Sequence, residues 1–178
     1  MKNETQNILN PAATSLNVLV VYDDLAAGLL SKDLYDRLVQ RFDPACPFTL
    51  IAWSLSALTL PELARAAADD AAKTDLLIVA VNGETILPSS IKSWISRSVR
   101  RVRSHAGALV AQLHGIVRTD QEITPAYGCL KHIAEDFGVD FFSEVVEPVG
   151  EKLDNSIEGI HKRAHMSSPV LDALLQLK

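Results

Sequence analysis

Short apolar runs alternate with helix-like segments along most of this chain. The runs that have the length of a single strand are Leu16–Tyr22, Phe48–Trp53, Leu76–Val81, Ala108–Leu113 and Asp140–Val145. Nearly continuous apolar runs of this length are typical of strands that are covered on both faces, as in a parallel sheet. The pattern therefore predicts five buried strands.

The segments between these runs each carry one apolar stripe at helical spacing. In the first, Leu30, Leu34 and Leu38 recur in steps of four. In the second, Thr59 precedes Pro61 and Glu62, which predicts that the Thr59 side chain caps a helix. The predicted helices span about residues 28–42, 59–72, 89–102 and 124–137, the last ending before Gly138.

Strands that alternate with helices of this length require crossover connections, which make the sheet parallel. We predict a three-layer α/β sandwich with a five-stranded parallel sheet in the order 2-1-3-4-5, occupying residues 15–147. Residues 1–14 are expected to be a flexible N-terminal segment. Residues 148–178 are expected to form a C-terminal arm, with a short helix in Pro169–Leu177 that folds back on the domain or pairs two subunits into a homodimer.

The composition disfavours several classes of protein. Of the 178 residues 48% are hydrophobic, and 17 Lys and Arg against 22 Asp and Glu give a formal net charge of −5. This acidic balance disfavours a nucleic-acid binder, and the longest apolar runs are too short for a membrane span. Cys46 and Cys129 lack a CxxC spacing and indicate two reduced thiols rather than a disulfide or a zinc site. We expect a cytoplasmic protein with neither membrane nor nucleic-acid partners.

Polar residues follow the predicted strands. Ligands of open parallel sheets bind outside the carboxyl ends of the strands, near the switch in strand order. The candidate ligand-binding residues at this edge are Asp23, Asp24, Trp53, Ser54, Asn82, Gly83, Glu84 and His114. No catalytic residue follows from the sequence, because Ser54 and His114 lack a nucleophile-elbow motif. His161 and His165 lack the rest of a metal-binding pattern, so no metal site is expected.

The run Val18–Asp24, which ends in two aspartates, resembles the first strand of response-regulator receiver domains. In that family paired carboxylates hold Mg²⁺ beside a phosphoacceptor Asp. Here Asn82 stands at the third strand end, and the family's Lys after the fifth strand is missing. The resemblance implies a receiver-like domain without phosphotransfer. Alternatively, the two aspartates simply cap the following helix.

The order of elements also resembles that of flavodoxins, which cradle the flavin phosphate in a Ser/Thr-rich loop after the first strand. Asp23 and Asp24 occupy that place here and would repel an anion. The chain also lacks the glycine-rich dinucleotide and P-loop motifs. A longer similarity, over about residues 16–115, is to uncharacterised bacterial α/β proteins of flavodoxin-like, Rossmann-like fold. It rests on Tyr22-Asp23-Asp24, Gly28, Trp53-Ser54, Leu87-Pro88 and Trp94, and it implies a fold without an activity.

The third predicted helix is basic toward its carboxyl end, where it carries Lys92, Arg97, Arg100, Arg101 and Arg103. This is either a solvated face or a docking surface for an acidic partner or a phosphate-rich ligand. Taken together, the sequence favours a non-catalytic, receiver-like or flavodoxin-like binding or regulatory module with an unknown small-molecule or protein ligand. The alternative is an enzyme or a binder of a flavin or nucleotide cofactor that uses the same sheet edge; the cofactor itself is not indicated.

Overall fold

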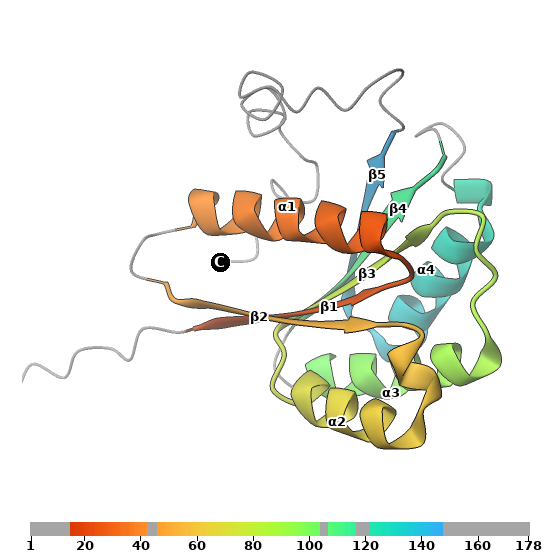
Figure 1. The fold of residues 1–178 in the computed structure, drawn as a ribbon, viewed down its shortest axis with the longest axis horizontal. Coiled ribbons are helices and arrows are strands. Elements are labelled where there is room, and N and C mark those ends of the chain that lie inside the picture. The colour runs from red at the N-terminus through yellow and green to blue at the C-terminus, as the bar shows by residue number, and fades with distance from the viewer. Residues whose placement is uncertain (1–14, 43–45, 104–106, 117–121, 148–178) are drawn as a thin grey trace, which may run out of the picture.

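Five parallel strands form one sheet in the order β2-β1-β3-β4-β5 (Figure 1), as predicted. The structure, a computed structural model, describes residues 15–42, 46–103, 107–116 and 122–147. The strands are β1 Leu16–Tyr22, β2 Phe48–Ser54, β3 Leu76–Asn82, β4 Ala108–His114 and β5 Asp140–Val146. β1 pairs with both β2 and β3, so the strand order reverses between β1 and β3.

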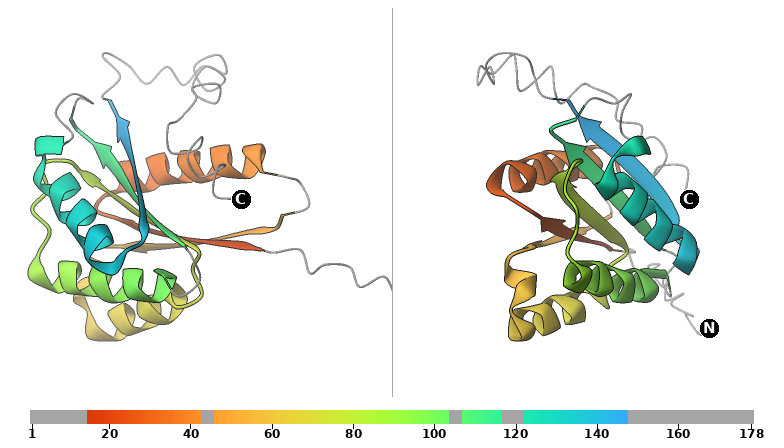
Figure 2. Two further views of the ribbon diagram at one scale, coloured as in Figure 1. Left: turned by 180° about the vertical axis from the view of Figure 1, so that it is seen from behind. Right: turned by 90° about the vertical axis from the view of Figure 1, so that its right-hand side faces the viewer.

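Helices cover both faces of the sheet (Figures 1 and 2) and complete the three layers. Helix α1, Leu25–Arg41, lies on one face. Helices α2, Pro61–Ala71, α3, Ser89–Arg103, and α4, Pro125–Phe137, lie on the other, and a short 3₁₀ turn, η1, Ala57–Thr59, precedes α2. The fold is that of a flavodoxin-like α/β sandwich.

Alternate strand residues separate the core into two clusters. Leu77, Val79 and Val81 of β3 are fully buried against the α2–α4 layer. Ile78 faces the other way and packs in the cluster that contains Leu34 and Leu38 of α1. Both faces of the central strands are therefore buried, which explains why their sequences are nearly continuous apolar runs.

The strand ends and the start of α2 differ from the prediction. Each of β2 to β5 extends one residue further than predicted. The added residues are the polar Ser54, Asn82 and His114 and, in β5, Val146. Thr59 is wrong as a helix cap: it belongs to η1, where its hydroxyl donates to the Ser56 carbonyl at 2.6 Å, and α2 begins after Leu60 without a side-chain cap. Gly138 does end α4, with φ at 61°.

Three expectations fall beyond the described residues: the N-terminal segment, the C-terminal arm and the helix within Pro169–Leu177. Among the helices that the structure does describe, none has both the length and the apolar character needed to cross a bilayer.

Candidate functional site at the carboxyl edge of the sheet

Asp23 joins the ends of three neighbouring strands. It follows β1 directly, and its backbone N–H donates to the Ala80 carbonyl of β3 at 3.1 Å. Its Oδ2 accepts from the Asn82 backbone N–H at 2.8 Å, and its Oδ1 lies 3.3 Å from Nε2 of His114 at the end of β4. Since the Asp23 and His114 side chains are only 21% and 15% exposed, the pair is held in place but remains open to a ligand.

Asp24 caps helix α1. It has extended backbone geometry, and its Oδ1 accepts from the Ala27 backbone N–H at 2.8 Å. The cap explains why α1 begins at Leu25, earlier than the apolar stripe alone indicated. The Asp24 carboxylate thus lies at the positive end of the helix dipole.

Two turns hold the neighbouring strand ends in place. After β3, the Glu84 backbone N–H donates to Asn82 Oδ1 at 2.9 Å, and the Gly83 N–H donates to the His114 carbonyl at 2.9 Å. After β4, Gly115 has φ of 72°, and a Cβ there would lie 2.4 Å from Asn82 Nδ2. Glycine is therefore required at position 115 both by backbone conformation and by space.

One oxygen from each aspartate and one imidazole nitrogen of His114 all lie within 4.8 Å of one another. Two ligands on opposite sides of a metal ion are about 4.4 Å apart when each bond is about 2.2 Å long. Small side-chain adjustments would therefore let Asp23, Asp24 and His114 share one cation. The sequence indicated no metal site because no compact motif links residues 23 and 114, which only the sheet brings together.

The structure gathers some of the predicted site residues and separates others. Asp23, Asp24, Asn82, Gly83 and His114 form the cluster. In contrast, the indole of Trp53 packs against the core and donates to Asp70 Oδ2 at 3.0 Å.

The hydroxyl of Ser54 lies 3.0 Å from that of Ser56 and accepts from the Ala57 N–H. No described contact joins Ser54 to His114, so the structure gives no support to a serine nucleophile there. Glu84 is exposed and contributes its backbone N–H to the Asn82 turn.

A buried polar network on the α1 face escaped the sequence interpretation. Arg37 of α1 makes two hydrogen bonds to the carboxylate of Glu144 in β5, at 3.0 and 3.1 Å. Gln112 of β4 donates to Glu144 at 3.0 Å and to the Leu30 carbonyl, and accepts from Ser31 at 2.9 Å. Gln112 and Glu144 thus face a helix inside the protein rather than a ligand at the edge. The signal in the sequence was Gln112 within the otherwise apolar run Ala108–Leu113, together with Glu144 in the strand beside it.

Comparisons with solved structures agree with this architecture. The apo form of the NADH:FMN oxidoreductase EMOB superposes with a TM-score of 0.54 and 14% identity, over 92% of this chain and 90% of that one. A short-chain flavodoxin associated with a PDU bacterial microcompartment gives a TM-score of 0.49 and 14% identity over 84% and 94%. General stress protein 14 of Treponema denticola, solved in complex with FMN, gives 0.46 and 13% over 92% and 99%.

At 14% identity the superposition on EMOB, whose TM-score exceeds 0.5, shows a likeness in fold and nothing further. No protein-family model and no curated protein matches the chain.

Proposed function

We propose that this flavodoxin-like domain is a non-catalytic binding module that holds a divalent cation at the carboxyl edge of its sheet. The observation that carries the proposal is the convergence of Asp23, Asp24 and His114 within 4.8 Å. The imidazole suits Zn²⁺, and the two carboxylates suit Mn²⁺, so both ions are candidates for this set of ligands. The remaining coordination positions would be open to water or to a ligand that the cation recruits.

The surroundings of Asp23 favour this use. Its Oδ2 is held by the Asn82 N–H, so the carboxylate has one fixed orientation toward His114. Hydrogen bonds that orient a ligating carboxylate raise metal affinity, because less freedom is lost on binding. Asp24 is likewise held by the helix that it caps.

A flavin or nucleotide cofactor is the second candidate, favoured by the likeness in fold to an NADH:FMN oxidoreductase. The residues after β1 do not fit its phosphate. Asp24 already accepts the Ala27 N–H at the start of α1, and Asp23 adds a second negative charge beside it. An incoming phosphate would have to displace one carboxylate and approach another. The receiver-like alternative shares the cation but not the phosphotransfer, since Asn82 cannot form an acyl phosphate.

Isothermal titration of the full chain with MnCl₂ and with ZnCl₂ tests the proposal. We expect saturable binding of one ion, weakened at least tenfold by Asp23→Asn and by His114→Gln. Asp23→Asn is informative because its amide oxygen can still accept the Asn82 N–H. Glu84→Gln is the matched control, since it removes an exposed carboxylate from the same edge without removing a ligand, and it should bind as the original chain does.

Titration with FMN, followed by quenching of flavin fluorescence, separates the two candidates. We expect no saturable FMN binding. Tight FMN binding, together with cation binding that Asp23→Asn leaves unchanged, would overturn the proposal in favour of the cofactor.

A further inference from the structure

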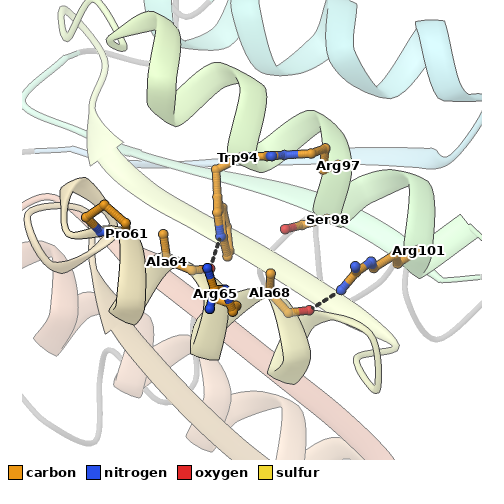
Figure 3. Close-up of a pocket in the computed structure, with 8 residues that line it drawn as sticks. All are labelled: Pro61, Ala64, Arg65, Ala68, Trp94, Arg97, Ser98 and Arg101. Carbon is orange, nitrogen blue, oxygen red and sulfur yellow. Dashed lines mark hydrogen bonds between the residues drawn. The ribbon is translucent and has the colours of Figure 1, made fainter.

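Helices α2 and α3 leave a groove between them on the outer surface of the molecule (Figure 3), away from the sheet edge. Its volume is about 400 Å³. It is lined by Pro61, Ala64, Arg65 and Ala68 of α2 and by Trp94, Arg97, Ser98 and Arg101 of α3. Pockets that hold small molecules begin at about 300 Å³, so the groove has room for a compact ligand.

The groove is strongly basic. Arg65 approaches from α2, and Arg97 and Arg101 approach from α3 (Figure 3). None of the described residues that line it is acidic. All three arginines are exposed, and one Arg101 nitrogen donates to the Ala68 carbonyl at 2.6 Å, which holds that side chain across the groove. Three guanidinium groups around one hollow favour an anion that accepts several hydrogen bonds.

Ser98 supplies a second, independent indication of a ligand. Its side chain lines the groove from α3 but is only 1% exposed. Within the described part of the chain, its Oγ has no hydrogen-bond partner. A buried hydroxyl without a partner is unfavourable, so such groups are rare in folded proteins.

The floor of the groove is fixed and apolar. The Trp94 indole is 2% exposed, and its N–H donates to the Ala64 carbonyl at 3.0 Å, which ties α3 to α2. Ala64 and Ala68 are small, and this keeps the two helices close while leaving the hollow above them. A ligand therefore meets a fixed apolar floor with exposed arginine side chains around it.

We infer that this groove is a second binding site, which takes the phosphate group of a small phosphorylated molecule. Arg65, Arg97 and Arg101 neutralise the phosphate, and the Ser98 hydroxyl donates to one of its oxygens. The site is separate from the sheet edge and does not depend on the cation proposed there. It also separates the basic residues of α3 by role: Arg97 and Arg101 line the groove, whereas the exposed Arg100 does not.

Calorimetric titration of the full chain with inorganic pyrophosphate, in about 0.1 M NaCl, tests the inference. We expect saturable binding that Arg97→Glu abolishes and that Ser98→Ala weakens by about three- to tenfold. Arg100→Glu is the matched control, because it makes the same charge change on the same helix outside the groove; it should weaken binding less than about twofold at this salt concentration.

Ser98→Ala tests the contribution of the hydroxyl by itself. It leaves the charge unchanged and alters the packing volume little, so the variant should fold normally. Adenosine 5′-monophosphate and adenosine form a further pair of probes, of which only the first should bind. The inference is overturned if pyrophosphate does not bind, if Arg97→Glu and Arg100→Glu weaken binding equally, or if Ser98→Ala binds as tightly as the original chain. Binding of an acidic peptide without binding of pyrophosphate would likewise contradict it and point to a protein partner.

Discussion

Asp24 serves the fold as a helix cap and the proposed site as a ligand, and substitution can separate these two roles. Asp24→Ala removes both, and we expect it to lower the free energy of unfolding by about 1 kcal/mol because the Ala27 N–H loses its partner. Asp24→Ser keeps a capping oxygen and should retain most of the stability. Both variants should bind Mn²⁺ more weakly. Urea denaturation and calorimetry measure the two effects, and equal stability of the two variants would contradict the capping role.

Gly115 fixes the turn that carries His114 into the site. Gly115→Ala should destabilise the protein by about 1–3 kcal/mol, because alanine disfavours the positive φ and its Cβ would strike the Asn82 amide. Gly128→Ala is the control: this helical glycine of α4 has nothing within 4 Å of an added Cβ, so the change should be neutral or stabilising. Thermal unfolding of the two variants measures the contrast, and a Gly115→Ala variant as stable as the original would contradict the assignment.

Cys129 should ionise at a higher pH in the folded protein than in the unfolded chain, because burial raises the pKa of its thiol. Burial raises the pKa of the Cys129 thiol, and the charge of Lys92 lowers it by a smaller amount. Because the folded pKa lies above the unfolded one, the thiol contributes stability below the unfolded pKa that is lost as pH rises through the folded pKa. In a Cys46→Ser variant, the alkylation rate of Cys129 should therefore rise at a higher pH in the folded protein than in urea. Coincident pH profiles would contradict this.

At the scale of elements, a buried ion pair fixes helix α1 to the far side of the sheet. Arg37 on α1 and Glu144 on β5 are 9% and 6% exposed, and the Glu144 carboxylate also accepts from the Gln112 amide. Arg37 Nε is also 3.3 Å from Asp33 Oδ2, an ion-pair contact without hydrogen-bond geometry. The pair therefore links α1, which packs mainly on β1 and β3, to the edge strand β5.

Removing one member of this ion pair should destabilise the protein more than removing both. Arg37→Leu leaves the Glu144 carboxylate buried, with the Gln112 amide as its remaining described partner. We expect it to lower the free energy of unfolding by about 3–5 kcal/mol. The double variant Arg37→Leu/Glu144→Leu should recover much of that loss, because no buried charge remains. Urea denaturation of the single and double variants forms the test. Additive effects of the two substitutions would show that the pair is not coupled.

The strands and helices were readable from the sequence because their apolar periodicity is set by burial on the two faces of the sheet. The prediction that Thr59 caps a helix was wrong because its hydroxyl bonds within a short 3₁₀ turn instead. Sequence spacing does not distinguish such a turn from a side-chain cap. Asp24 as a cap was one of two open interpretations, and the bond to Ala27 confirms it.

The site was only partly readable. Parallel strands bring their carboxyl ends to one edge, so the positions of Asp23, Asn82 and His114 followed from the strand order alone. The direction of each side chain did not follow, which is why Trp53 was expected at the edge but bonds to Asp70. The α2–α3 groove was not predictable, because it depends on how two helices lie beside each other.

At the scale of the molecule, an acidic cluster and a basic groove lie at different places on the surface. Carboxylates gather at the carboxyl edge of the sheet, and arginines gather in the α2–α3 groove. The likeness in fold to an NADH:FMN oxidoreductase describes the scaffold alone. We propose that this scaffold presents a cation site at the carboxyl edge of its sheet, formed by Asp23, Asp24 and His114.

Paramagnetic broadening tests the proposed cation site, because it locates the bound ion on the full chain in solution. Substoichiometric Mn²⁺ is added to the ¹⁵N-labelled protein, and the loss of each amide signal is followed by NMR. We expect the amides of Asp23, Asp24, Asn82 and His114 to broaden first, with Arg97 and Ser98 in the groove unaffected, and Asp23→Asn to abolish the selectivity. Uniform broadening, or selective broadening away from the sheet edge, would contradict the cation site.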